Sequence, residues 1–241
     1  MAMKAVILAG GEGTRLRPLT YVANKNLLPL YDKPVISHTM EKLVAAGMKE
    51  IMIISSPHHI DQFKSLLGTG EGCSISYGIQ KEAKGIAHGL YVAREFVGTD
   101  DCLFWLGDNV IEDDIKNLIK GFSKGAKIFL KKVSDPERFG VASVDKDLNV
   151  TDIVEKPSKP KTDLAVVGLY LYDSTVWKKI ERQKPSARGE YEVTDLNIEY
   201  MKEGKLKAAL LKEAWFDIGS FESLFQASAY AREKALKAKK K

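Results

Sequence analysis

The chain has 241 residues, of which 44% are apolar and 29% charged, and this composition excludes an intrinsically disordered protein. No apolar run reaches the ~20 residues that a membrane-spanning helix needs, so we expect no membrane partner. The net charge of +5 resides in residues 232–241, where six basic side chains and one acidic side chain account for all of it. Because the remaining chain is neutral, we expect no nucleic-acid partner and interpret the basic tail as a solvated helix end.

The cysteine usage and the N-terminal residues indicate the compartment. Cys73 and Cys102 form neither a CxxC pair nor a metal-ligand cluster, which favours free thiols in a reducing environment. Residues 1–10 lack the basic region, long apolar stretch and small-residue cleavage site of a secretory signal. We therefore expect a cytoplasmic protein.

The first half of the chain alternates short apolar strands with amphipathic helices. Strands are predicted at residues 4–8, 51–54, 74–79 and 102–106. Helices are predicted at residues 35–46, 60–67, 86–96 and 113–122. This alternation at short spacing predicts a parallel sheet that is covered on both faces by helices.

The second half is richer in strands. Strands are predicted at residues 128–133, 140–144, 150–154, 165–172 and 207–211, with a hairpin turn at 145–149. Helices are predicted at residues 175–180 and 193–202, and Ser220 is expected to cap a final helix that runs toward the basic end. We predict one α/β domain over residues 1–241, with a Rossmann-like mixed, mostly parallel sheet flanked by helices and a small α+β portion.

A glycine-rich segment, residues 8–18, follows the first strand and is named here the glycine loop. Gly10, Gly11 and Gly13 lack Cβ atoms, so the backbone can approach a ligand closely and several N–H groups can face one anion. The loop differs from the dinucleotide-binding fingerprint because Leu16 stands where the third glycine belongs. It also lacks the Gly-Lys-Ser/Thr ending of a Walker A loop.

Two basic residues follow these glycines closely. The guanidinium of Arg15 is always charged, and Lys25 adds an ammonium group ten positions later. Fixed cations beside an amide-lined loop suit a triphosphate better than they suit a turn without a ligand. The glycine loop is therefore predicted to bind nucleotide phosphates.

The glycine loop resembles that of the sugar-phosphate nucleotidylyltransferases, and the nearest subgroup is that of the glucose-1-phosphate thymidylyltransferases. The resemblance begins with Gly-Gly-x-Gly-Thr-Arg-Leu-Arg-Pro-Leu-Thr at residues 10–20 and continues through Asn-Lys-Asn-Leu-Leu-Pro-Leu at 24–30. Further segments match in the same order, at residues 106–109, 137–141, 155–157, 167–170, 188–195 and 214–219. The matching motifs cover nearly the whole chain.

The resemblance implies a reaction and its partners. A pyrimidine nucleoside triphosphate, with dTTP favoured, would react with glucose 1-phosphate to give a nucleotide-sugar and pyrophosphate. The sugar's phosphate oxygen would attack the α-phosphorus in line, and positioning with electrostatic stabilisation would supply most of the catalysis. The resemblance also implies a homo-oligomer of two or four chains. Residues 1–110 would form a nucleotide-binding half and residues 111–231 a sugar-phosphate-binding half, followed by the basic tail.

The resemblance assigns roles to individual residues. Arg15 and Lys25 would be catalytic, and Asp108 and Asp217 would hold Mg²⁺, a cation that prefers carboxylate and phosphate oxygens. The nucleotide would contact Leu8, Gly10, Gly11, Gly13, Thr14, Arg15, Gln80, Gly85 and Asp108. The sugar phosphate would contact Gly140, Glu155, Lys156, Gly168, Tyr170, Arg188 and Trp215. The side-chain amide of Gln80 can both donate and accept, so it can pair with the imide edge of a pyrimidine.

Two alternatives remain open. Residues 81–88 lack the proline-containing stretch common in thymidylyltransferases, and the Ala-Lys-Gly-x-x-His portion looks more like that of uridylyltransferases acting with UTP on glucose or another hexose 1-phosphate. The second alternative is a non-catalytic regulatory subunit that binds nucleotide-sugar. Such a subunit would be expected to have lost Arg15, Lys25, Asp108 or Asp217, and all four are present.

Overall fold

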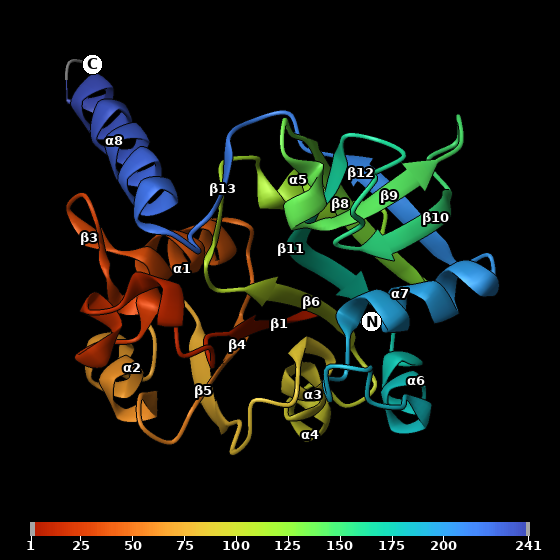
Figure 1. Cartoon of the computed structure of the whole chain (residues 1–241). Coiled ribbons are helices and arrows are strands. Elements are labelled where there is room, and N and C mark those ends of the chain that lie inside the picture. Colours follow the sequence, from red (N-terminus) through yellow and green to blue (C-terminus); the bar gives the residue numbers. More distant parts are fainter. Residues whose placement is uncertain (1–2, 240–241) are drawn as a thin grey trace.

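The computed structural model describes residues 3–239 and is built around a nine-stranded mixed sheet (Figure 1). The strand order is β10-β9-β11-β6-β1-β4-β5, with β8 paired to β11 and β12 paired to β8. The strands are β1 (Met3–Leu8), β4 (Glu50–Ser55), β5 (Ser74–Ile79), β6 (Asp101–Leu106), β8 (Ala126–Lys132), β9 (Gly140–Val144), β10 (Val150–Glu155), β11 (Leu164–Tyr172) and β12 (Leu206–Leu210). The predicted α/β class and mixed sheet are confirmed.

The parallel part of the sheet is formed by β5, β4, β1 and β6, and its strands are apolar because both faces are covered. Side chains alternate between the faces along each strand. Val6 of β1 and Phe104 of β6 belong to one hydrophobic core, whereas Ile7 and Trp105, one position further along, belong to the other. All four side chains are fully buried.

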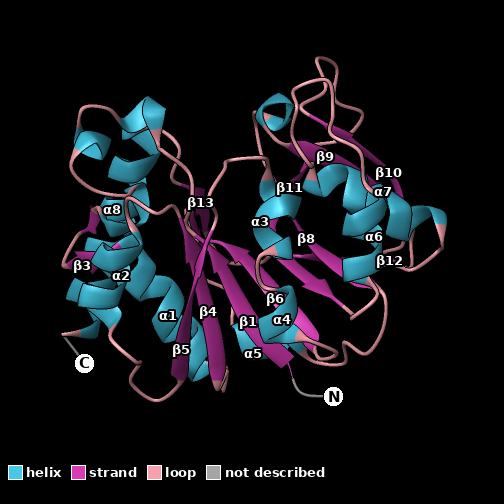
Figure 2. Cartoon of the chain, turned by 90° about the horizontal axis from the view of Figure 1, so that it is seen from below, coloured by secondary structure: helices cyan, strands magenta, loops and turns pink. Residues whose placement is uncertain are grey.

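Helices cover both faces, as the alternating pattern predicts (Figure 2). One face packs against α1 (Val35–Ala45), α2 (Ile60–Leu67) and α5 (Ile115–Ile119). The other face packs against α3 (Ile86–Tyr91), α4 (Arg94–Val97), α6 (Val176–Arg182) and α7 (Val193–Lys202). No described helix is both long enough and apolar enough to cross a bilayer.

The second half of the chain adds antiparallel pairs to the parallel strands. β11 runs antiparallel to β6, β8 and β9, and β9 and β10 form a hairpin. The side chain of Asp145 stabilises the hairpin turn, because its Oδ1 accepts hydrogen bonds from the backbone N–H groups of Asp147 (2.9 Å) and Asn149 (2.8 Å). The turn predicted at residues 145–149 is therefore confirmed.

Two predicted helices are shorter than their sequence patterns. Residues 86–96 form α3 and α4 with a tightened turn between them, where Val92 and Ala93 donate to carbonyl groups only three residues earlier. The helix expected at residues 113–122 is reduced to α5. Asp114 is its N-cap and accepts a hydrogen bond from the backbone N–H of Lys116, and Lys120 ends the helix because its backbone is extended (φ −56°, ψ 132°).

Short elements between the main ones were not predicted. Of three 3-10 helices, η1 (Thr14–Leu16) lies within the glycine loop, and η2 (Leu19–Tyr21) and η3 (Lys25–Leu27) follow it. The pairs β2 (Pro29–Leu30) with β3 (Lys33–Pro34), and β7 (Asn109–Ile111) with β13 (Trp215–Asp217), form two small antiparallel ladders. A fourth 3-10 helix, η4 (Pro136–Arg138), precedes β9.

The final helix, α8 (Phe221–Ala238), begins where the sequence predicts. The side-chain oxygen of Ser220 accepts a hydrogen bond from the backbone N–H of Ser223, and the side-chain oxygen of Ser223 accepts one from the backbone N–H of Ser220. The helix points away from the sheet, and Ala227 is its one fully buried residue (Figure 1). The basic tail is largely a continuation of α8, and residues 240–241 lie outside the described residues.

Candidate active site

A cavity of about 370 Å³, named here the active-site cavity, lies beyond the carboxyl end of β6. Nine of the residues predicted to form the site line it: Arg15, Asp108, Gly140, Glu155, Lys156, Gly168, Tyr170, Trp215 and Asp217. A smaller cavity of about 140 Å³ is lined by Gly13, Thr14, Arg15 and Lys25. Because Arg15 lines both cavities, the two form neighbouring parts of one site.

Asp108 and Asp217 come together through backbone pairing between β7 and β13. Asp217 lies opposite Asn109 in this antiparallel ladder, and the backbone N–H of Ile218 donates to the carbonyl oxygen of Asp108 (2.8 Å). Both carboxylates line the active-site cavity. The fold therefore joins two aspartates that the sequence separates by nearly half of the chain.

The two carboxyl groups have opposite pKa shifts. Burial, and next the charge of Asp108, raise the pKa of Asp217 from its ordinary value of 3.8 to about 6. Burial also acts to raise the pKa of Asp108, but the charge and hydrogen bond of Lys25, together with the hydrogen bond from Asn109, outweigh it, and the pKa of Asp108 is lowered. Lys25 forms an ion pair with Asp108, and both side chains are mostly buried. Asp108 is thus ion-paired with Lys25, whereas the nearby charges of Lys25, Arg15 and Arg138 only partly offset the raised pKa of Asp217.

Lys25 is held in place by the residues around it. Asn24 caps η3 by accepting a hydrogen bond from the backbone N–H of Asn26 (2.9 Å). The amide nitrogen of Asn24 donates to the carbonyl oxygen of Ala9 (2.8 Å), which ties η3 to the end of β1. Asn24 and Asn26 are both 1% exposed. Lys25 is therefore fixed relative to the glycine loop.

The glycine loop makes a tight turn at Gly13, which has a φ of +61°. A Cβ atom at this position would lie 2.9 Å from the methyl group of Thr20, and the hydroxyl of Thr20 donates to the Gly13 carbonyl oxygen (2.9 Å). Only glycine fits both the backbone conformation and this close approach. Thr14 and Arg15 follow as the first residues of η1, which directs them to the site.

Asn109 connects the carboxylates to the opposite wall of the cavity and was not predicted as a site residue. Its amide nitrogen donates to Oδ1 of Asp108 (2.9 Å), and its Oδ1 accepts from the backbone N–H of Gly168 (3.0 Å) and from Nε1 of Trp215 (2.8 Å). Its side chain is 3% exposed. The signal in the sequence is an amide residue directly after an aspartate at the end of an apolar strand.

Asp113 fixes the segment that leads into β13 and was also not predicted. Its two carboxylate oxygens accept hydrogen bonds from the backbone N–H groups of Lys212 and Glu213 (2.9 Å each). Lys131 donates to the carbonyl oxygen of Glu213 (2.6 Å) from the other side. These contacts hold β13, and with it Asp217, against β7.

The opposite wall of the cavity carries the residues expected to bind the sugar phosphate. Glu155 accepts a hydrogen bond from the hydroxyl of Thr194 (2.7 Å), a lining residue that was not predicted. Lys156 lines the cavity and has a φ of +43°, a conformation that side-chain-bearing residues adopt uncommonly. Arg188 does not line the cavity, and its guanidinium is paired with the carboxylate of Glu192 (2.9 Å).

The residues predicted to contact the nucleotide base lie near the start of the glycine loop, away from the two cavities. Gln80 follows β5 and is 7% exposed, and its amide nitrogen is 3.3 Å from the carbonyl oxygen of Gly85. Leu8 ends β1, and Gly10 lies against the Gln80 side chain. Gln80, Gly85, Leu8, Gly10 and Gly11 are therefore grouped around the start of the loop, outside the two site cavities.

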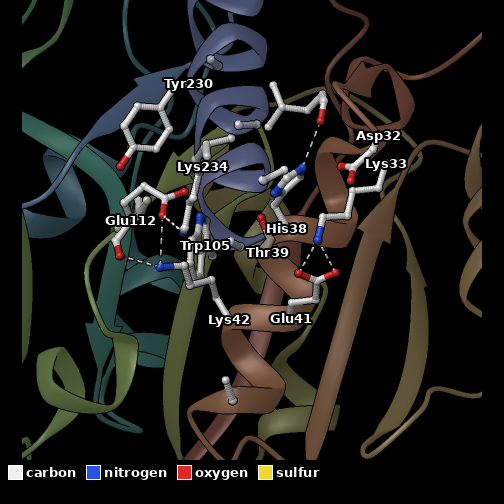
Figure 3. A pocket seen from close by; sticks show the side chains of 18 residues that line it. Asp32, Lys33, His38, Thr39, Glu41, Lys42, Trp105, Glu112, Tyr230 and Lys234 are labelled. Atoms are coloured by element: carbon white, nitrogen blue, oxygen red, sulfur yellow. Dashed lines mark hydrogen bonds and ion pairs between the residues drawn. The ribbon is translucent and has the colours of Figure 1, made fainter. Parts of the chain in front are cut away.

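A further cavity of about 390 Å³ lies between α1 and α8 (Figure 3). None of the predicted site residues lines it. The lysines labelled at its rim are paired: Lys33 donates to both carboxylate oxygens of Glu41 (2.6 Å), and Lys42 and Lys234 both contact Glu112. This cavity therefore contains none of the residues that are predicted to bind the nucleotide, the metal ion or the sugar phosphate.

Comparison with known proteins gives the family. Residues 4–234 match the family model described as nucleotidyl transferase, and the chain belongs to this family. It is 41% identical over 238 residues to glucose-1-phosphate thymidylyltransferase of Neisseria meningitidis serogroup A, covering 95% of this chain and 83% of that protein. The resemblance inferred from the motifs is thereby confirmed.

Solved structures agree on the fold. A Bacillus anthracis protein, crystallised in complex with sucrose, is 45% identical to this chain, with a TM-score of 0.91 and 96% of each chain covered. UDP-glucose pyrophosphorylase complexed with UDP-glucose is 24% identical, with a TM-score of 0.87 and 97% and 100% of the two chains covered. The second likeness concerns the fold alone.

Proposed function

We propose that this protein is a nucleotidylyltransferase that converts a pyrimidine nucleoside triphosphate, with dTTP favoured, and glucose 1-phosphate into a nucleotide-sugar and pyrophosphate. The observation that carries the proposal is the shared cavity. Arg15, Asp108 and Asp217, which are predicted to act on the nucleotide phosphates, line the same cavity as Glu155 and Lys156, which are predicted to bind the sugar phosphate. The names of the relatives support the choice of dTTP and glucose 1-phosphate.

The paired aspartates fit a Mg²⁺ ion. They supply two carboxylates to one cavity, where burial, and next the charge of Asp108, raise the pKa of Asp217. No group of three or more His, Cys, Asp or Glu side chains suited to a metal occurs among residues 3–239. Mg²⁺ often binds through one or two carboxylates, with substrate phosphates and water completing its shell. When bound, the ion would neutralise charge on the phosphates.

The reaction itself needs only the two substrates and the side chains that bind them. The attacking phosphate of glucose 1-phosphate is an anion and needs no general base. Its oxygen forms a bond to the α-phosphorus, the bond between the α-phosphorus and its bridging oxygen breaks, and pyrophosphate leaves with that oxygen. Arg15 and Lys25 neutralise the triphosphate and the leaving group, while Glu155 binds sugar hydroxyls and Lys156 binds the sugar's phosphate.

A pyrophosphate-release assay tests the proposal. The purified protein with Mg²⁺ is given dTTP, UTP, CTP, ATP or GTP, each with glucose, galactose, mannose or N-acetylglucosamine 1-phosphate. We expect release to be strongest with a pyrimidine triphosphate and glucose 1-phosphate. Preference for UTP would favour the uridylyltransferase alternative, and preference for ATP would refute the base assignment.

The assay also separates the proposal from the non-catalytic alternative. A regulatory subunit would bind nucleotide without pyrophosphate release. The ion pair between Lys25 and Asp108 and the pairing of β7 with β13 favour an enzyme, because both arrange charged groups for phosphate chemistry. We further propose a cytoplasmic homo-oligomer of two or four chains, as the resemblance implies, with light scattering as the test of its size.

A further inference from the structure

Arg138 lines the active-site cavity but is not among the residues predicted to bind a substrate. It ends η4, directly before β9, on the wall that also carries Glu155 and Lys156. Among residues 3–239, Arg15 and Arg138 are the two arginines that line this cavity, whereas Arg188 does not. Arg138 is therefore the arginine that the sugar-phosphate wall presents to a ligand.

The guanidinium of Arg138 has a partner that it can leave easily. Its Nη1 donates to Oδ2 of Asp135 (2.6 Å), three residues earlier in the chain. The two side chains are 45% and 39% exposed, and ion pairs between side chains so open to water contribute little to stability. Arg188, by contrast, donates twice to a carboxylate of Glu192 that is only 12% exposed. Arg138 can therefore exchange its carboxylate for a phosphate more readily than Arg188 can.

Aromatic side chains keep Arg138 at the cavity. Its guanidinium lies 5.3 Å from the centroid of the Phe139 ring, and Phe139 packs against Trp215 with 5.2 Å between the ring centroids. Both aromatic side chains line the active-site cavity. Trp215 and Asp217 are two positions apart in β13, so their side chains lie on the same face of that strand. The aromatic pair thus places the guanidinium on the side of the cavity where Asp217 lies.

The charge of Arg138 reaches the paired aspartates. Burial, and next the charge of Asp108, raise the pKa of Asp217. The charge of Arg138 acts to lower it, as do those of Lys25 and Arg15. Such an effect requires that the charges be near each other. Arg138 therefore acts on the place where the nucleotide phosphates and the sugar phosphate are proposed to meet.

Lys156 is the neighbour of Arg138 on this wall. Its backbone N–H donates to the carbonyl oxygen of Phe139 (3.0 Å), which ties Lys156 to the end of η4. The site therefore has two cations on each side: Arg15 and Lys25 beside the glycine loop, Arg138 and Lys156 opposite. Lys156 is already proposed to bind the sugar's phosphate. Arg138 is then the cation of this wall that is left for the group that passes between the two substrates.

We propose that Arg138 is a catalytic residue that leaves Asp135 and donates to a non-bridging oxygen of the α-phosphoryl group during its transfer to the sugar phosphate. The sugar's phosphate oxygen forms its bond to the α-phosphorus, the bond to the bridging oxygen breaks, and pyrophosphate takes that oxygen with its electron pair. Arg138 stays protonated throughout and transfers no proton. Its charge stabilises the transition state, where negative charge is spread over the phosphoryl oxygens. The inference rests on the proposed function and adds a residue to its mechanism.

Steady-state kinetics with dTTP, glucose 1-phosphate and Mg²⁺ tests the proposal in four variants. Arg138→Gln removes the charge, and Arg138→Lys keeps the charge but loses the planar guanidinium. Asp135→Asn releases the arginine from its partner without removing it. Arg182→Gln, at an exposed arginine at the end of α6, is the matched control. The Kd of dTTP, measured by calorimetry, shows that each variant is folded.

We expect Arg138→Gln to lower kcat about a hundredfold, as for one lost group that stabilises transition-state charge, and to change either KM by less than about threefold. Arg138→Lys should recover part of the loss. Asp135→Asn and Arg182→Gln should keep the wild-type kcat, and all four variants should keep the Kd of dTTP.

A sulfur-substituted nucleotide locates the contact. In dTTP with sulfur in place of one non-bridging α-oxygen, the isomer whose sulfur faces Arg138 should react more slowly than dTTP with the wild type. Arg138→Gln should lose most of this difference, because the contact that sulfur weakens is already absent.

Several results would overturn the proposal. A loss of kcat in Asp135→Asn equal to that in Arg138→Gln would assign the effect to the broken ion pair. A higher KM for glucose 1-phosphate at unchanged kcat would assign Arg138 to ground-state binding of the sugar's phosphate, and weaker dTTP binding would assign it to the nucleotide. Equal sulfur effects in the wild type and Arg138→Gln would exclude the α-phosphoryl contact. A wild type that released no pyrophosphate would refute the proposed function itself, so the two failures can be told apart.

Discussion

Asp108 and Asp217 are held side by side by their backbones, through the hydrogen bond from Ile218 N–H to the Asp108 carbonyl oxygen and the pairing of Asp217 with Asn109. Two carboxylates in one buried place repel each other, and Lys25 compensates only one of them directly. Burial, and next the charge of Asp108, raise the pKa of Asp217 to about 6. A cation placed between the two carboxylates would stabilise the charged form of Asp217.

Asp217→Asn should make the metal-free protein more stable at neutral pH. Between the ordinary pKa of 3.8 and about 6, the folded state keeps a proton at Asp217 that the unfolded state releases, so stability falls as the pH rises through this window. At pH 7.5 we expect the free energy of unfolding of Asp217→Asn to be about 2 kcal/mol higher than that of the wild type. Urea denaturation in EDTA checks this. A difference that did not shrink toward pH 4 would contradict the assignment.

Lys25→Met should destabilise the protein because it leaves the carboxylate of Asp108 buried without its partner. We expect a loss of about 3 kcal/mol at pH 7.5, and the double variant with Asp108→Asn should recover most of it. The pKa of Asp108 is lowered in the fold, so its ion pair adds stability above the ordinary carboxyl range and loses it as the pH falls. A double variant no more stable than Lys25→Met would show that the pair is not the cause.

Asp113→Ala should weaken metal binding although Asp113 is not one of the proposed metal ligands. Without its two hydrogen bonds to Lys212 and Glu213, the segment before β13 is held by fewer contacts, and Asp217 is positioned less firmly. We expect a several-fold higher Mg²⁺ concentration at half-maximal activity and about 2 kcal/mol less stability. The neighbouring Asp114→Ala is the control, since it removes only hydrogen bonds from Lys116 and Asn117 of α5 and should leave the Mg²⁺ dependence unchanged. Equal Mg²⁺ dependence in both variants would rule out this role for Asp113.

Lys156→Ala should affect glucose 1-phosphate more than Arg188→Ala does. Lys156 lines the active-site cavity, whereas Arg188 is paired with Glu192 and would have to leave that carboxylate to reach a phosphate. We expect the KM for glucose 1-phosphate to rise about tenfold in Lys156→Ala, as for one charge-assisted hydrogen bond, and less in Arg188→Ala. Steady-state kinetics at saturating nucleotide checks this. A larger effect in Arg188→Ala would show that Arg188 turns into the cavity when substrate binds.

Much of the fold could be predicted because the strands buried on both faces are continuous apolar runs. The residues of β1 and β6 show this directly, since Ala5, Val6, Leu103 and Phe104 are all fully buried. The ladder between β7 and β13 could not be predicted in the same way. Trp215–Asp217 has only three residues and an acidic end, and its partner lies near the middle of the chain, so no local pattern indicates it.

The candidate site was predicted less completely than the fold, for a related reason. Asp108 and Asp217 were named through the family resemblance, and the structure brings them into one cavity. Asn109 and Asp113 were missed because their importance lies in hydrogen bonds to distant backbone groups, which a sequence does not display. The roles of the individual site residues stay predictions for the experiments above.

Binding of Mn²⁺, followed by electron paramagnetic resonance, tests the central claim most directly. In the presence of dTTP, the wild type should bind one ion tightly, and both Asp108→Asn and Asp217→Asn should weaken that site by at least about tenfold, because each removes a carboxylate ligand. Nucleotide binding measured without metal shows that the variants are folded. Tight Mn²⁺ binding that survives in either variant would contradict the claim that the two aspartates hold one ion together.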